Sequence, residues 1–338
     1  MSNTRLQLHT ARELGETLLR LALHGHDPAL AVIADYTLGA TWFCLGVFSV
    51  AHQHHQHMKE SIVRYTPDQS RALVFRMGQD PGVACRVLAA VTLWFLGYPE
   101  QALAHVHDAL ALAHELSHPF SLVFARLFAA FVYQWRRDMP AVQAQAEAAV
   151  ALATEQGFPL WAAGGTSVCG WALAMQGQGE EGIAQIRQGI VAYRATGAVL
   201  FVPYFCTVLA EVSAHLGHTE DGLQALAEAH TLVEQQEERY WEAEVCRLRG
   251  VLLLRQPETS QAEAETWLLR ALDVARRQQA KSLELRAAMS LARLWQCQGK
   301  RGAARDLLAP IYNWFTEGFD TADLQETKGL LEVLSRKA

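Results

Sequence analysis

The sequence predicts an all-α protein, a right-handed solenoid of antiparallel helix pairs that repeat about every 40 residues. Three observations predict this fold. A turn recurs at a fixed spacing, small residues recur at fixed distances from that turn, and apolar residues lie three and four apart with no alternating strand pattern. The apolar fraction of 51% is ample for a continuous core. We therefore expect a single continuous solenoid.

The recurring turn is marked by glycine at three positions and by arginine at a fourth. Gly97, Gly177 and Gly217 differ by multiples of 40 (177 − 97 = 80; 217 − 177 = 40), and Arg137 lies at 97 + 40. A glycine just after a helix can take the left-handed conformation that ends it. Prolines near the starts of the next helices recur at a similar spacing: Pro119, Pro159 and Pro203.

Small residues recur at three positions relative to each turn. Two antiparallel helices joined by a short turn can approach closely only where their side chains are small, so these positions predict the contact between the two helices of a pair. They lie seven residues before the turn (Ala90, Ala130, Gly170, Ala210), five after it (Ala102, Val142, Gly182, Gly222) and twelve after it (Ala109, Ala149, Gly189, Ala229).

The period is broken at two places. Gly97 follows Gly46, the turn of an earlier pair, by 51 residues, which is 11 more than the period (97 − 46 = 51; 51 − 40 = 11). A two-residue insertion near Gln256 and Pro257 shifts the later register. The resulting divisions are N-terminal helices with a first helix pair (1–63), an irregular insertion (64–80), a regular array (81–318) and a C-terminal capping helix (319–338).

Composition argues against several classes of protein. Lysine and arginine (29) are outnumbered by aspartate and glutamate (35), so the net charge of −6 does not favour a nucleic-acid partner. No apolar stretch is long enough for a membrane span and no secretion signal is evident, so we expect a cytoplasmic protein. Six widely spaced cysteines are expected to be reduced and buried: Cys44, Cys85, Cys169, Cys206, Cys246 and Cys297.

No motif predicts catalysis or a cofactor. Gly177, Gly179 and Gly182 match the spacing of a dinucleotide-binding loop, but a predicted helix precedes them instead of a strand, so we assign them to the turn and to helix packing. Ser167 and Cys169 lack the strand and the glycine pattern of a nucleophile elbow. A phosphate-binding loop is absent from the sequence. We therefore predict that the chain is not an enzyme.

A run of four histidines is the best metal candidate. His52 and His55, like His54 and His57, are three residues apart and could share a helix face. A structural zinc site needs four ligands and a catalytic one usually has three protein ligands. We therefore interpret the run as a solvated helix face and predict no metal.

The loop before the regular array fits a helix start. Asp80 followed by Pro81 is typical of an N-cap and a first helical residue. The loop also borders the irregular insertion, where functional loops are often found, so an added ligand-binding role stays open.

The repeat resembles the tetratricopeptide repeat, although 40 residues exceed the 34 of that family. GQDPGVAC (78–85), LWFLGYPEQAL (93–103), GWALAMQGQGEEG (170–182) and QQAKSLELRAAMSLARLWQCQGK (278–300), continuing into LLAPIYNWFTEGFDTADLQETK, resemble the C-terminal repeat region of large bacterial signalling proteins. In those proteins a class III adenylate or guanylate cyclase domain, or a kinase domain, precedes a signalling ATPase domain. The likeness runs from about Thr4 to Leu334 and implies a regulatory repeat region, without the activities of those other domains.

In tetratricopeptide-type repeats the first helix of each pair forms the concave inner face. Counting from the small residue of that helix gives a groove that is aromatic at first and charged later, and such a groove suits an amphipathic helix or peptide. Glu244 occupies one of these inward positions. The predicted groove residues are Trp94, Phe124, Phe131, Gln134, Trp171, Tyr204, Glu211, Arg247, Arg286 and Arg293.

These observations predict a non-catalytic regulatory or scaffold solenoid that binds a protein or peptide. The alternative is a sensor that holds a small apolar molecule in the aromatic part of the groove. A further alternative concerns the rings themselves, because long helices could curl the solenoid tightly enough to bury them against one another. The identity of the partner and the oligomeric state stay open.

Overall fold

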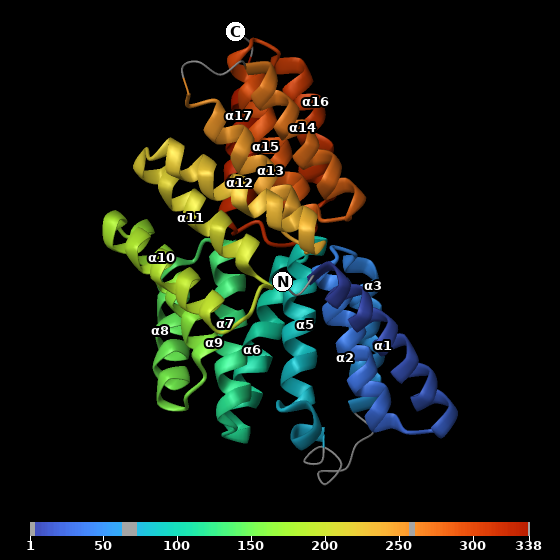
Figure 1. The fold of residues 1–338 in the computed structure, drawn as a ribbon. Coiled ribbons are helices and arrows are strands. Elements are labelled where there is room, and N and C mark those ends of the chain that lie inside the picture. The colour runs from blue at the N-terminus through green and yellow to red at the C-terminus, as the bar shows by residue number, and fades with distance from the viewer. Residues whose placement is uncertain (1–3, 63–72, 257–260, 337–338) are drawn as a thin grey trace.

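The computed structural model describes residues 4–62, 73–256 and 261–336, and all regular structure in them is helical (Figure 1). The all-α solenoid prediction is confirmed. The predicted insertion, 64–80, falls largely on residues 63–72, which lie outside the described residues, as do 257–260. The helices are α1 (Thr4–Gly25), α2 (Pro28–Cys44), α3 (Phe48–Ile62), α5 (Pro81–Leu96), α6 (Pro99–Leu116), α7 (Pro119–Arg136), α8 (Met139–Glu155), α9 (Pro159–Met175), α10 (Gly179–Ala195), α11 (Val202–Leu216), α12 (Thr219–Gln236), α13 (Glu242–Leu253), α14 (Gln261–Arg277), α15 (Lys281–Cys297), α16 (Arg301–Trp314) and α17 (Ala322–Ser335).

The helix ends follow the turn chemistry of the sequence. Gly97 and Gly217 cap α5 and α11 with φ of 94° and 83°, in the left-handed region. Arg137 caps α7 in the same conformation, with φ of 61°, so the repeat imposes the turn even without glycine. The carboxylate of Asp80 accepts a hydrogen bond from the Val83 N–H at 2.9 Å, which confirms the predicted N-cap.

The small residues allow the two helices of a pair to touch backbone to backbone. A Cβ atom added at Gly182 would lie 2.4 Å from the carbonyl oxygen of Gly170, and one at Gly189 would lie 2.7 Å from the backbone nitrogen of Ser167. Both distances are shorter than any real contact, so α9 and α10 can pack this closely only because these positions carry no side chain.

The solenoid coils so that helices far apart in the sequence touch one another. Helices α5, α7, α9, α11, α13 and α15 form the inner layer and each contacts the next, while α6, α8, α10, α12, α14 and α16 lie outside them. The inner layer also contacts itself across the coil, because α15 touches α5. A second long-range contact joins α1 to α12, which lies outside the inner layer. Figure 1 shows α13–α17 lying above α5–α7.

Hydrogen bonds to backbone carbonyl groups join these successive turns of the coil. The Cys44 carbonyl oxygen accepts from the N–H groups of Arg239 and Tyr240, at 2.7 and 3.2 Å. The hydroxyl of Ser282 donates to the carbonyl oxygen of Trp94. These contacts close the interior, as described below.

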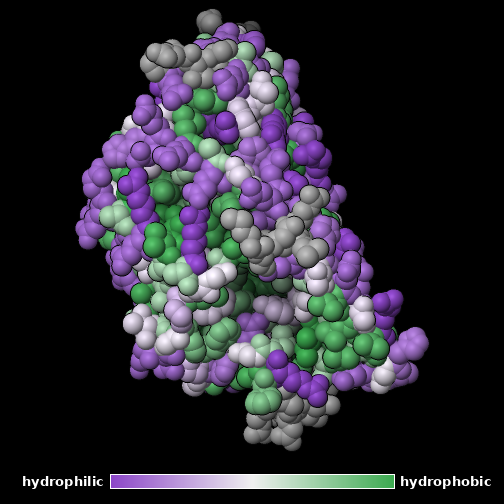
Figure 2. All heavy atoms as spheres, viewed as in Figure 1, coloured by the Kyte–Doolittle hydropathy of each residue, from purple (hydrophilic) through white to green (hydrophobic). Residues whose placement is uncertain are grey.

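Exposed apolar residues in the described part of α1 include Leu14, Leu21 and Leu23. Figure 2 shows hydrophobic residues gathered over α1 and α2 and hydrophilic residues over most of the same face. Among the described residues, no helix is long and apolar enough to cross a membrane. The six cysteines are free thiols, and the expectation that all are buried is wrong for Cys297, which is exposed.

Candidate functional site

Most of the predicted groove residues are buried, so they do not line an open groove. The five aromatic residues, Trp94, Phe124, Phe131, Trp171 and Tyr204, are each no more than 5% exposed. The expectation of an open aromatic groove is therefore wrong for this structure, and the alternative in which the rings bury one another describes it.

Two of these rings, Trp94 and Tyr204, pack against Trp241 from a later turn of the coil. Trp241, at the start of α13, lies 5.6 Å from Trp135 and 5.4 Å from Tyr204, measured between ring centroids. Trp94 lies 5.0 Å from Trp135. Trp241 is itself 4% exposed, so these rings bury one another.

The later part of the inner face is a buried ion-pair network. Arg247 binds Glu244 with two hydrogen bonds, at 2.6 and 2.8 Å. Arg286 pairs with Asp323 at 2.7 Å and lies 3.7 Å from Glu244. Burial alone would raise the pKa of Glu244, but the Arg247 and Arg286 guanidiniums outweigh it and lower that pKa to about 2. Glu244 is therefore a carboxylate at neutral pH.

The remaining predicted polar residues also have partners. The Tyr204 hydroxyl donates to the side-chain oxygen of Gln134. Glu211 accepts a hydrogen bond from the Trp171 indole N–H at 2.9 Å. Arg293 is exposed at the rim of the interior and pairs with Glu326 at 2.8 Å. Each of these polar side chains therefore already has a partner within the fold.

The structure adds a buried carboxyl group that the sequence analysis did not identify. Glu238 is 1% exposed and its Oε1 accepts the Phe201 N–H at 2.7 Å, while its Oε2 has no hydrogen-bond partner among the described residues. Burial raises the pKa of this carboxyl group to about 8. The sequence carried no signal for it beyond one more glutamate in an acidic stretch.

An open groove of about 990 Å³ lies on the outside of the coil, between its successive turns. We call it the inter-turn groove. Its volume is in the range of known ligand sites. One wall comes from α3, α5 and α6, and the other from α14, α15 and α16. The lining residues are Ser49, His52, Gln53, His55, Gln56, Lys59, Leu93, Leu96, Tyr98, Gln101, His105, Arg276, Gln279, Lys281, Glu284 and Trp314.

The turn at Gly97 shapes the floor of the inter-turn groove. A Cβ atom at this position would lie 2.6 Å from the Trp314 ring and 2.7 Å from the Lys281 side chain. Glycine at this position therefore allows both the left-handed turn and the close approach of Trp314 and Lys281. The Lys281 ammonium lies 5.3 Å from the Trp314 ring centroid, and Tyr98 lies 5.7 Å from that ring.

The inter-turn groove carries positive charge. Lys59, Arg276 and Lys281 contribute three positive charges and Glu284 one negative, a net of +2 (3 − 1 = 2), in a chain whose net charge is −6. Burial, with His105 and His52 close by, lowers the pKa of His55 to about 4, so this imidazole is neutral at pH 7. The charge of the groove therefore comes from its lysines and its arginine.

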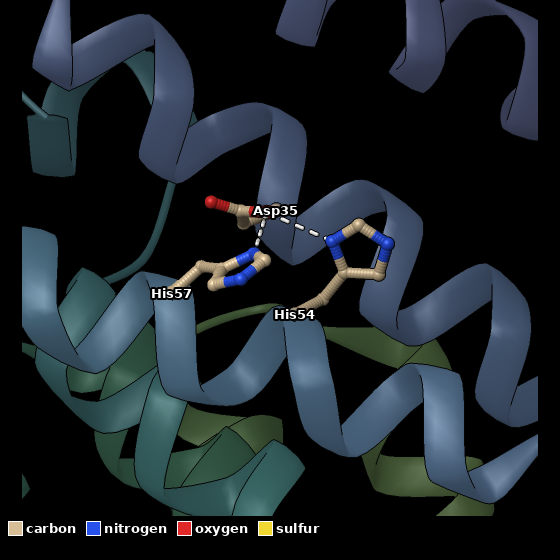
Figure 3. Close-up of side chains that lie close together, drawn as sticks. All are labelled: Asp35, His54 and His57. Atoms are coloured by element: carbon tan, nitrogen blue, oxygen red, sulfur yellow. Dashed lines mark hydrogen bonds and ion pairs between the residues drawn. The ribbon is translucent and has the colours of Figure 1, made fainter.

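Asp35, His54 and His57 form the group in the described part of the chain that could hold a metal ion (Figure 3). Asp35 is on α2, and both histidines are on α3. The glycines that match the spacing of a dinucleotide-binding loop lie between two helices. Gly177 is in the turn between α9 and α10, and Gly179 begins α10.

Comparisons with known proteins support the fold. No family model matches the chain. An uncharacterised protein of Rhizobium meliloti (strain 1021) is 24% identical over 273 residues, which are 80% of this chain and 26% of that protein. The chain thus spans about a quarter of the length of the curated relative it matches.

Several solved structures are similar in fold at low sequence identity. A Rap protein complexed with competence and sporulation factor has a TM-score of 0.63 at 12% identity, covering 90% of this chain and 77% of that one. The Rap conjugation gene regulator of plasmid pLS20, in complex with the Phr* peptide, has a TM-score of 0.61 at 10% identity, covering 93% and 79%. The apo quorum sensor NprR from B. thuringiensis has a TM-score of 0.55 at 12% identity, covering 91% and 83%. The chain therefore has a tetratricopeptide-like solenoid fold.

Proposed function

We propose that this chain is a non-catalytic regulatory solenoid that binds a peptide segment in the inter-turn groove. The observation that carries the proposal is the local charge of +2 around an apolar floor, opposite in sign to the chain as a whole. Leu96 and Trp314 offer apolar surface beside the buried Leu93. Lys59, Lys281 and Arg276 also line the groove, the last two paired with Glu284. This chemistry fits a short peptide in which acidic residues flank an apolar side chain.

Two further observations favour a peptide partner. The similar solved structures include a Rap protein complexed with competence and sporulation factor and a Rap regulator in complex with the Phr* peptide. The closed aromatic interior leaves the small-molecule alternative without its expected pocket. The inner-face residues Gln134, Glu211 and Arg293 remain a second candidate contact surface, which would require the coil to open.

The proposed setting is a larger cytoplasmic signalling protein. The match to about a quarter of a longer relative supports this proposal, because it places a similar repeat region inside a longer polypeptide. The resemblance to the repeat region of cyclase and ATPase signalling proteins agrees with it.

The first test is native mass spectrometry of the full chain purified from a cell extract. We expect a bound peptide that dissociates on unfolding. Its affinity would then be measured by fluorescence anisotropy for the wild type and for the double variant Lys59→Glu, Arg276→Gln, with Arg20→Glu on exposed α1 as the matched control.

We expect the double variant to weaken binding by about tenfold or more, since rim charges steer and hold a charged partner, and the control to bind normally. If the double variant binds normally and Arg293→Glu does not bind, the peptide binds at the inner face and not in the inter-turn groove. A co-purified molecule of metabolite size would instead support the small-molecule alternative.

A further inference from the structure

The buried carboxylate of Asp35 faces two histidines of the neighbouring helix. Asp35 is 3% exposed, and its Oδ1 lies 2.8 Å from His54 Nδ1 and 3.7 Å from His57 Nδ1. Figure 3 shows both imidazole rings directed at this carboxylate from consecutive turns of α3. Within the described residues, these two imidazoles are its ion-pair partners, with no lysine or arginine among them.

The arrangement supplies three ligand atoms of the right type around one point. The three atoms all lie within 4.8 Å of one another. Zinc–ligand bonds of about 2.1 Å in a tetrahedron place the ligand atoms about 3.4 Å apart. The His57 contact is already near that separation, and the His54 contact needs to lengthen by roughly 0.6 Å.

Two imidazole nitrogens with one carboxylate oxygen favour a zinc-type transition ion over magnesium or calcium, which prefer oxygen ligands. The His57 side chain is 62% exposed, so an ion from solvent can reach this ligand. A buried carboxylate is costly unless a cation or hydrogen bonds balance it, and a divalent ion would do so directly.

We propose that Asp35, His54 and His57 form a binding site for a divalent transition-metal ion of the zinc class, which ties α2 to α3. The site does not depend on peptide binding. It lies on another face of α3 from the histidines His52 and His55, which line the inter-turn groove.

The chain contains its own control for this proposal. His52 and His55 have the same three-residue spacing on the same helix, with ring centroids 5.6 Å apart, but the described residues place no carboxylate between them that completes a group of three ligands. Spacing alone predicts that both pairs bind equally. The structure predicts that only the pair facing Asp35 binds strongly.

The experiment is a titration of the metal-free full chain with Zn²⁺ by calorimetry against a competing chelator, together with the visible absorption of bound Co²⁺. We expect one strong site per chain and a rise in melting temperature with Zn²⁺. Exposed His57→Ala and the isosteric Asp35→Asn should each weaken this site by at least about tenfold, while His52→Ala should leave it unchanged.

Circular dichroism of the metal-free variants would show whether they keep the fold, and His57→Ala is the safer variant because its side chain is exposed. Absence of a strong site in the wild type would overturn the proposal. So would binding that survives both His57→Ala and Asp35→Asn, since the metal would then be held by others of the 14 histidines.

Discussion

Two buried glutamates, six residues apart, differ in their charged partners and in the direction of their pKa shifts. Glu238 and Glu244 are 1% and 4% exposed. Burial raises the pKa of Glu238 to about 8, whereas for Glu244 the effect of burial is outweighed by Arg247 and Arg286, and the pKa falls to about 2. The partner set decides the charge of each group, and burial alone does not.

The two glutamates belong to two regions of one interior. Glu238 adjoins the aromatic region, where burial and the carboxylate itself raise the pKa of Tyr240. Glu244 belongs to the charged region, whose cations come from α13 and α15. The aromatic region excludes water without offering a counter-charge, and the charged region supplies one for each group it buries. The following variants test that difference.

The largest effect is expected where the two regions meet, at Trp171. Its ring is 2% exposed, and its indole N–H donates to Glu211. Trp171→Ala would leave a cavity and an unpaired acceptor, so we expect a loss of about 4 kcal/mol in the free energy of unfolding, measured by urea denaturation. A small loss of stability with a large loss of partner binding would restore the open-groove hypothesis.

The next effect is expected in the charged region. Glu244→Gln would remove the carboxylate that balances Arg247 and Arg286, and we expect it to destabilise by about 3 kcal/mol at pH 7. Urea denaturation at low and high salt would measure it, and a buried network should respond weakly to salt. An unchanged midpoint would mean that Asp323 and Glu211 alone balance both arginines.

A smaller effect of opposite sign is expected for Glu238. Since folding raises its pKa from 4.5 to about 8, its contribution to stability is fully present below pH 4.5 and is lost as the pH rises toward 8. Glu238→Gln should therefore stabilise the protein by about 2 kcal/mol at pH 8.5 relative to the wild type, and very little at pH 4. Urea denaturation at both pH values measures this difference. Equal effects at the two values would contradict an unpaired buried carboxyl group.

The smallest effect is expected at the rim. Arg293 is 51% exposed and its pair with Glu326 is open to solvent. Arg293→Ala should change the free energy of unfolding by less than about 0.5 kcal/mol. Thermal denaturation is sufficient to check this. A loss of stability as large as that of Glu244→Gln would mean that the Arg293–Glu326 pair belongs to the stabilising ion-pair network.

The sequence predicted the parts of the fold that are local. Gly97, Gly217 and Asp80 have the capping roles expected from turn chemistry, and Gly182 and Gly189 occupy the predicted helix contacts. Each of these roles depends on residues in one helix pair. These roles can therefore be predicted from the spacing of residues within the repeat.

The closure of the interior was not predictable in the same way. Trp94 and Trp241 approach to 6.2 Å between ring centroids, although 147 residues separate them (241 − 94 = 147). Their contact depends on the small rotation from each helix pair to the next, summed over several pairs, and no residue pattern states that angle. The inter-turn groove was missed for the same reason, since Lys59 and Arg276 lie on different turns. In the sequence the histidine run was visible only as a separate surface feature.

The bonds from Cys44 to Arg239 and Tyr240 also change how the chain should fold. An open repeat array has only nearest-neighbour couplings, so it can nucleate anywhere and lose terminal repeats one at a time. Here the first helix pair also neighbours the start of α13, nearly two hundred residues later, which raises the contact order and couples these two parts of the chain. This array should unfold as one cooperative unit, like a globular domain, and removal of either end should destabilise the other.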